Sequence, residues 1–355
     1  MRISLLMLTG LLAVGYQSGR QPAATAAAPC TSYTTTACAQ WVMLAGGPAR
    51  AMVYSTYALD KANPAIRRAL IMVHGTNRNA DHYFGTATAA AFLGGALQDT
   101  VVIAPHMIDR QDKAETNEVV WESSWRTGGP SMANPALSSF DFVDEILRTL
   151  ATKSLFPNMN TIVVTGHSAG GQFANRYAMS NKVHDTLGVP VSYVVANPSS
   201  YAWPDAMRPL SVDDADTATA KDGWSLMPET TAHTKFTYGP FDATKAPNYN
   251  RWPAGLENRT GYTKDMTDDQ LRKQLASRPT TFLLGQVDTL PLGGFDSSPT
   301  AMAQGPTRRA RGEAYFKYIT EQMGAKQQIY IVPECGHNDR CMYTTDAVFP
   351  FIFPK

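Results

Sequence analysis

The chain has 355 residues, of which 44% are hydrophobic and 17% charged, and its formal net charge is +1. This length and composition predict a globular protein with a sizeable core, built as one large α/β domain or two small ones. The balanced charge, together with the lack of any block of lysine and arginine residues, argues against a nucleic-acid partner.

The N-terminus, MRISLLMLTGLLAVG, has one arginine followed by an apolar run and then the small-residue stretch AATAAA. This order is typical of a signal peptide, so we expect residues 1–28 to be removed on export and the protein to be secreted or periplasmic. The apolar run is shorter than the roughly 20 residues that a membrane-spanning helix needs. Tyr16 stands where a bacterial lipobox would place the lipidated cysteine, so we expect no stable membrane anchor.

Residues 29–355 predict a single α/β domain. We expect a hairpin first, with strands in WVMLAGG and ARAMVYSTYAL around a Gly-Gly-Pro turn. Apolar runs typical of strands buried on both faces then alternate with helical patterns such as FDFVDEILRTLAT. The runs lie at residues 69–75, 101–105, 161–166, 192–198, 280–285 and 328–333. This alternation predicts a mainly parallel central sheet with helices on both faces.

The segment from about residue 199 to residue 278 interrupts this alternation. It is rich in proline and contains stretches such as APNYNRWPAG that fit neither a buried strand nor a long helix. A plain connection is rarely so long, so we expect a cap or lid insertion over the edge of the sheet.

The four cysteines form two near-neighbour pairs, Cys30 with Cys38 and Cys335 with Cys341. Four cysteines allow three pairings, and the local one closes the shortest loops. Export would expose these thiols to an oxidising compartment, which favours two local disulfides. Zinc ligands usually stand two to four residues apart, so the spacing argues against a metal site.

The segment TIVVTGHSAGG ends an apolar run in Gly-x-Ser-x-Gly and continues into the helical pattern QFANRYAM. A strand that ends in this motif and opens a helix is the setting of a nucleophile elbow, in which a strained turn exposes the serine. The alternative is an ordinary glycine-rich turn between a strand and a helix. The rest of the chain decides between them, because Ser168 needs a base, an acid and oxyanion donors to act as a nucleophile.

His337 and Asp288 are the predicted base and acid. After a nucleophile elbow the chain order is serine, acid, histidine, and His337 follows the last apolar run. Asp288 follows the run before it, with one helix and one strand between the two residues. Asn197 holds the other common acid position but is an amide, and Asp205 is the alternative carboxylate near it.

The oxyanion hole needs two backbone N–H groups. Ala169, directly after the nucleophile, is expected to supply one of them. The loop HGTN after the first buried run is expected to supply the other, from Thr76 or alternatively from Asn77.

The GHSAGG motif, the HGTN loop, Asp288 and His337 occur in an order that resembles the α/β-hydrolase superfamily, from about Trp41 to the C-terminus. Further stretches, including NPSSY and AQGPTRRARG, are similar to an exported branch of that superfamily whose substrate is unassigned. The resemblance implies the α/β-hydrolase fold and a Ser-His-Asp triad that works through an acyl-enzyme. It also implies that neither a metal nor an organic cofactor is needed.

We therefore expect a secreted serine hydrolase that cleaves carboxylic esters, with a small-molecule or polymeric ester as substrate. The alternatives are a polymer depolymerase or a peptidase with the same triad, and a non-catalytic binding protein on a hydrolase scaffold. Trp121 and Trp125 are expected to line the cleft as an aromatic platform. Three arginines in AQGPTRRARG either face a substrate carboxylate or form a solvated or salt-bridged helix start, and these are Arg308, Arg309 and Arg311.

Overall fold

In the computed structural model, residues 28–213 and 235–355 are described. The predicted signal peptide and part of the predicted insertion therefore lie outside the described residues. No helix in the described ranges is long and apolar enough to cross a membrane.

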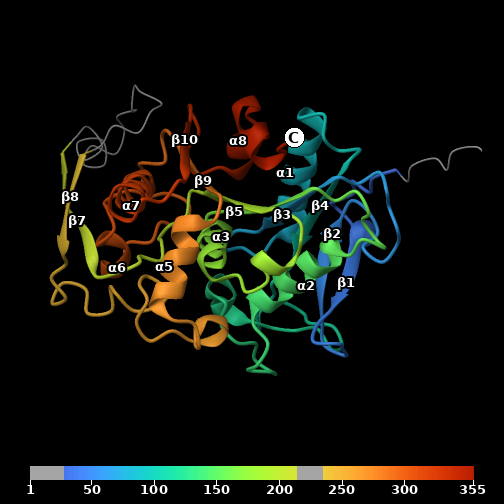
Figure 1. Ribbon diagram of the computed structural model, residues 1–355, viewed down its shortest axis with the longest axis horizontal. Helices are drawn as coiled ribbons and strands as arrows, with labels where there is room; N and C mark the ends of the chain where they lie inside the picture. The colour runs from blue at the N-terminus through green and yellow to red at the C-terminus, as the bar shows by residue number, and fades with distance from the viewer. Residues whose placement is uncertain (1–27, 214–234) are drawn as a thin grey trace, which may run out of the picture.

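An eight-stranded sheet forms the centre of the molecule, in the order β1-β2-β4-β3-β5-β6-β9-β10 (Figure 1). Strands β3 to β10 of this sheet run parallel, and β1 and β2 pair antiparallel as the predicted hairpin, with Trp41 opposite Met52. Strand β2 pairs antiparallel with β4 and joins the hairpin to the parallel part. The strands are β1 (Ala39–Met43), β2 (Arg50–Ser55), β3 (Arg68–Val73), β4 (Thr100–Pro105), β5 (Thr161–His167), β6 (Val191–Ala196), β9 (Thr280–Gly285) and β10 (Gln328–Val332).

Side chains alternate along each central strand, and the two sets enter different cores because the sheet is covered on both faces. In β5, Ile162 and Val164 join one cluster of buried side chains while Val163 joins another. One face is covered by α1 (Ala80–Leu93), α8 (Asp339–Thr344) and α9 (Phe349–Ile352). The other is covered by α2 (Ser139–Ala151), α3 (Ala169–Ser180), α5 (Asp268–Ser277) and α7 (Arg308–Met323). Figure 1 shows α1 and α8 on one side of the sheet and α2, α3 and α5 on the other.

Helix α2 forms where the amphipathic pattern predicts it. Its buried face includes Phe142, Ile146 and Leu147. Ser138 begins the helix with a capping box, since its side chain accepts from the Asp141 N–H while the Asp141 carboxylate accepts from the Ser138 N–H. The expected fold class, an α/β sheet with helices on both faces, is confirmed.

Between β6 and β9 the described part of the chain adds a two-stranded antiparallel sheet, β7 (Met207–Asp213) and β8 (Lys235–Pro240). This small sheet lies beside α7 (Figure 1). The Tyr238 hydroxyl donates to the Ala314 carbonyl of that helix at 2.7 Å. The same stretch also contains α5, whose Leu271 and Leu275 pack into the core shared with α3 and α7. The remaining short elements are α6 (Pro299–Met302) and the 3₁₀ turns η1 (Thr36–Cys38), η2 (Glu122–Thr127), η3 (His184–Thr186), η4 (Gly261–Thr263) and η5 (Asp346–Val348).

Candidate active site

Ser168 lies on a strained turn between β5 and α3. Its backbone has φ 59° and ψ −119°, a left-handed conformation that is costly for any residue with a side chain. The flanking glycines are needed because the chain passes so close to itself. A Cβ on Gly166 would stand 2.5 Å from backbone atoms of Gly170, and one on Gly170 would stand 2.2 Å from the Val73 carbonyl oxygen. The Ser168 hydroxyl is thereby placed at the carboxyl edge of the sheet.

His337 joins Ser168 to Asp288. Its Nε2 lies 3.0 Å from the Ser168 Oγ, and its Nδ1 lies 2.8 Å from the Asp288 Oδ2. A carboxylate accepts hydrogen bonds only, so Nδ1 carries the proton and Nε2 is left to accept from the serine hydroxyl. The Asp288 side chain is 2% exposed and that of His337 is 10% exposed, which shields the pair from competing water.

Asp288 has a second partner in Arg308, in the first turn of α7. The guanidinium lies 3.2 Å from the Asp288 Oδ1, while Oδ2 binds His337. Arg308 also donates to the Leu292 and Gly293 carbonyls at 2.8 and 2.9 Å. It therefore fixes both the carboxylate and the loop that follows it.

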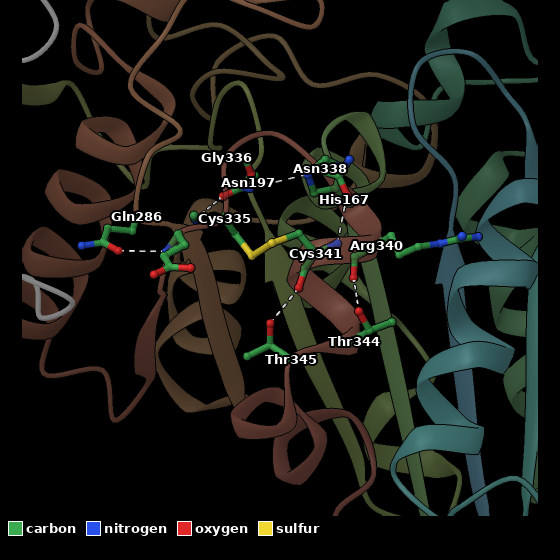
Figure 2. The surroundings of a disulfide bond; sticks show 12 residues. His167, Asn197, Gln286, Cys335, Gly336, Asn338, Arg340, Cys341, Thr344 and Thr345 are labelled. Atoms are coloured by element: carbon green, nitrogen blue, oxygen red, sulfur yellow. Dashed lines mark hydrogen bonds between the residues drawn. A yellow bond between two sulfur atoms is a disulfide. The ribbon is translucent and has the colours of Figure 1, made fainter. Parts of the chain in front are cut away.

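The loop that carries His337 is restrained by a disulfide and by side-chain hydrogen bonds (Figure 2). The disulfide between Cys335 and Cys341 encloses it. Before His337, the Gln286 side chain accepts from the Glu334 N–H at 2.8 Å and the Asn197 side chain donates to the Gly336 carbonyl at 3.2 Å. The Asn197 side chain also accepts from the Gly285 N–H at 2.8 Å, so it links this loop to the end of β9.

Two further histidines beside the site are held neutral. Burial, together with the nearby His337, lowers the pKa of His167 to about 3, and the two rings lie 4.5 Å apart. Burial also lowers the pKa of His74 to about 3. The Met107 N–H donates to Nε2 of His74. The Nδ1 of His74 therefore carries the proton and donates to the Gly75 carbonyl at 2.9 Å. His337 is thus the ring of this group that stands between a carboxylate and the serine hydroxyl.

A pocket of about 410 Å³ opens over Ser168 and His337. Its walls come from the segment between β3 and the first turn of α1, from Gly293 and Gly294, and from Asp339. Thr76 and Asn77 both line it, and Ala169 begins α3 directly after the serine. Neither the Thr76 nor the Ala169 N–H makes a backbone hydrogen bond within the described ranges outside regular elements.

Comparison with known proteins identifies the family. A family model for the alpha/beta hydrolase family matches residues 70–349. The chain belongs to the alpha/beta hydrolase family. No curated protein matches the sequence.

Two of the solved structures that share the fold of this alpha/beta hydrolase are polymer hydrolases. One is a poly(3-hydroxybutyrate) depolymerase from Bordetella parapertussis, with 23% identity and a TM-score of 0.56 over 85% of this chain and 84% of that one. The other is poly(aspartic acid) hydrolase-1 from Sphingomonas sp. KT-1, with 21% identity and a TM-score of 0.56 over 86% of this chain and 95% of that one. At these identities the likeness shows the fold alone.

Several residues of this alpha/beta hydrolase lie elsewhere than the sequence predicts. The expectation that Trp121 and Trp125 line the cleft is wrong. Trp121 is 0% exposed and stacks on Phe142, and Trp125 is 2% exposed with its ring 4.6 Å from that of His74. The core is favoured because burying these rings there removes more apolar surface from water than placing them in a solvated cleft.

The alternative acid, Asp205, is occupied elsewhere, since its carboxylate accepts from the Tyr318 hydroxyl at 2.6 Å and from the Met207 N–H at 2.9 Å. Of the options for the three arginines of α7, the salt-bridged helix start is observed for Arg308 and Arg309, which pair with Asp288 and Glu313. Arg311 instead donates to backbone carbonyls, including that of Ser199 at 2.6 Å. Arg308, Arg309 and Arg311 are all at most 1% exposed, so none is solvated.

The sequence reasoning missed two features of this alpha/beta hydrolase. One is the role of Arg308 behind Asp288, for which the only sequence signal was the unusual arginine cluster after Asp288. The other is a second histidine–aspartate pair, His82 with Asp339, on the wall of the pocket. The position of Asp339 two residues after His337 was its available signal.

Proposed function

We propose that this alpha/beta hydrolase is an exported serine hydrolase that cleaves carboxylic esters. The observation that carries the proposal is the hydrogen-bonded series from Ser168 through His337 to Asp288, set on the strained turn after β5. A serine hydroxyl is a weak nucleophile unless a base takes its proton, and this arrangement supplies one.

The reaction begins when the Ser168 Oγ attacks the ester carbonyl carbon and His337 accepts the hydroxyl proton at Nε2. The negative charge on the carbonyl oxygen is held by the N–H groups of Ala169 and Thr76. The carbon–oxygen bond to the alcohol then breaks, and His337 gives its proton to the departing oxygen. A water molecule attacks the acyl-enzyme in the same way, with His337 again as base, and releases the acid and Ser168. Asp288 orients the imidazole and stabilises its charged form throughout.

Two disulfides support export, because such bonds form and persist mainly in oxidising compartments. The structure pairs Cys30 with Cys38 and Cys335 with Cys341, as the spacing predicted. The predicted signal peptide itself lies outside the described residues.

The test is hydrolysis of p-nitrophenyl esters of increasing acyl length by the wild type and by Ser168→Ala. We expect turnover by the wild type and a fall in kcat of roughly 10⁶-fold in the variant, to the level of oxyanion stabilisation and binding alone. Equal background rates for both proteins would refute ester hydrolysis of this series. Labelling of Ser168 by a fluorophosphonate without ester turnover would point instead to the peptidase or depolymerase alternative. Neither labelling nor turnover would favour a binding protein.

A further inference from the structure

A second histidine–aspartate pair stands on the wall of the pocket above Ser168. The His82 Nε2 lies 3.0 Å from the Asp339 Oδ2, and the Thr86 hydroxyl donates to the same oxygen at 2.6 Å. His82 and Thr86 belong to α1, and Asp339 begins α8, two residues after His337. Both His82 and Asp339 line the pocket, with side-chain exposures of 43% and 14%.

Asp339 brings a negative charge to this wall. Burial alone would raise its pKa, but the hydrogen bonds from Thr86 and His82 outweigh burial and lower the pKa below its ordinary value. His82 adds at most one positive charge, so the pair is either neutral or negative. Arg78, which stands between the lining residues Asn77 and Asn79, is already paired with Asp109 at 3.0 Å and Asp112 at 2.7 Å.

The described lining is also poor in hydrocarbon. Asn77, Asn79 and Thr76 present amides and a hydroxyl, and Tyr83, the one phenyl ring of this lining, carries its own hydroxyl. Most ligand pockets are lined mainly by apolar side chains, which bind alkyl chains well. A long alkyl chain placed here would desolvate these polar groups without giving them partners.

We propose that this wall is an acyl subsite that takes a short, neutral, oxygen-bearing acyl group, and that His82 and Asp339 select it. This deepens the proposed function and rests on ester hydrolysis at Ser168. The loop that supplies the Thr76 oxyanion donor continues directly into the first turn of α1, so an acyl chain bound by its carbonyl oxygen extends along the wall toward His82.

The selection has two parts. His82 donates to Asp339 through Nε2, and its Nδ1 has no hydrogen-bond partner in the described ranges, so this nitrogen is free to bind a hydroxyl of the acyl group. Asp339 repels an acyl group that ends in a carboxylate, because two like charges in a partly buried pocket are poorly screened.

The proposal is tested with three ethyl esters that share a four-carbon acyl group, namely ethyl butyrate, ethyl 3-hydroxybutyrate and monoethyl succinate. Acid release is followed by titration at constant pH. For the wild type we expect kcat/KM to be highest for ethyl 3-hydroxybutyrate and lowest for monoethyl succinate. Ethyl decanoate, added as a fourth ester, should be cleaved more slowly than ethyl butyrate.

Three variants separate the contributions, and each is read as a ratio of kcat/KM values so that a general loss of activity cancels. Asp339→Asn should raise the succinate-to-butyrate ratio roughly 5- to 10-fold, since it removes the repelling charge. His82→Leu should abolish the preference for the hydroxylated ester, and His82→Gln should retain part of it. Asp81→Asn is the matched control, because Asp81 lies next to His82 on α1 but outside the pocket lining, and it should leave both ratios unchanged.

The results also distinguish this proposal from the proposed function. If Ser168→Ala and the wild type are equally inactive on every ester, ester hydrolysis fails. If the wild type cleaves the esters but Asp339→Asn and Asp81→Asn give the same succinate-to-butyrate ratio, the subsite is overturned while ester hydrolysis stands. A wild-type preference for ethyl decanoate or for monoethyl succinate would overturn it as well.

Discussion

Arg308 occupies a position that is unfavourable for a cation in two ways. Its side chain is fully buried, which removes hydration, and it stands in the first turn of α7, at the positive end of the helix dipole. These costs are offset by Asp288, by Ser199 at 3.2 Å and by the carbonyls of Leu292 and Gly293. The same contacts hold the proposed acid and the pocket wall in place, so we expect the side chain to act on the proposed reaction through Asp288.

Replacing Arg308 by methionine is therefore expected to lower kcat by up to about 100-fold, with a much smaller change in KM, because the acid and its loop lose their fixed position. Steady-state rates measured over a range of concentrations of an ester that the wild type cleaves give kcat and KM separately and so test this prediction.

Arg309→Met is the matched control for this prediction. Arg309 is equally buried in the same turn, but its guanidinium contacts Glu313 and the Gln286 carbonyl and not the Asp288 carboxylate. We expect Arg309→Met to lose a comparable amount of stability but to lower kcat much less than Arg308→Met does. If the two variants lower kcat equally, Arg308 has a structural role only.

At the scale of elements, the loop between β10 and α8 is the part of the site that depends most on a covalent link. The Cys335–Cys341 bond closes a short loop, so removing it as a pair of serines should cost only about 2 kcal/mol of unfolding free energy. We expect kcat to fall about 10-fold, because His337 gains freedom while the bonds from Asn197 and to Gln286 still restrain its loop. Urea unfolding and ester turnover measure the two quantities.

The second disulfide offers a control of nearly equal loop length. Cys30 and Cys38 are separated by eight residues and Cys335 and Cys341 by six, so the two double-serine variants should lose similar stability. The first pair lies beside β2 and away from the pocket lining, and its loss should leave kcat unchanged. Equal values of kcat for the two variants would contradict a positioning role for the bond at His337.

Strands and helices were predictable from the sequence where burial imposes a regular pattern of apolar residues. Strand β5 reads as a continuous apolar run because both of its faces are covered, and α2 repeats its apolar residues along one face. The roles of single side chains were less predictable, because they depend on neighbours distant in sequence. Trp121 stacks on Phe142 in the core, and Arg308 is buried in an ion pair with Asp288.

At the scale of the whole molecule, the candidate site follows from the parallel sheet. Carboxyl ends of parallel strands meet at one edge, so residues directly after β5, β9 and β10 come together although long stretches of chain separate them. That rule was enough to predict Ser168, Asp288 and His337 from chain order. The pair of His82 with Asp339 was not predictable in this way, because it joins two helices on one face of the sheet.

Histidines buried in the neutral form near this edge make the free energy of unfolding depend on pH in the acid range. Burial lowers the pKa of His74 and of His167 to about 3, from about 6.5 when unfolded, so each stabilises the fold fully above pH 6.5 and loses that contribution as the pH falls toward 3. Burial also lowers the pKa of His106 and His184, in the same direction. Asp144 has the opposite effect on stability, because burial raises its pKa to about 6. As the pH falls, the folded state therefore binds a proton at this carboxyl before the unfolded state does.

Near pH 5, unfolding should therefore take up about two protons at His74 and His167 and release about one from Asp144. The net uptake of about one proton predicts a loss of about 1.4 kcal/mol of unfolding free energy per unit fall in pH, and His106 and His184 make the slope steeper. Urea unfolding at pH 6, 5 and 4.5 measures it. Asp144→Asn removes the proton release at residue 144, while its amide still faces the hydroxyls of Tyr177 and Tyr262. The variant should therefore increase the slope to about 2.7 kcal/mol per pH unit. An unfolding free energy that stays constant over this range, or a slope that Asp144→Asn makes shallower, would contradict neutral burial of these histidines.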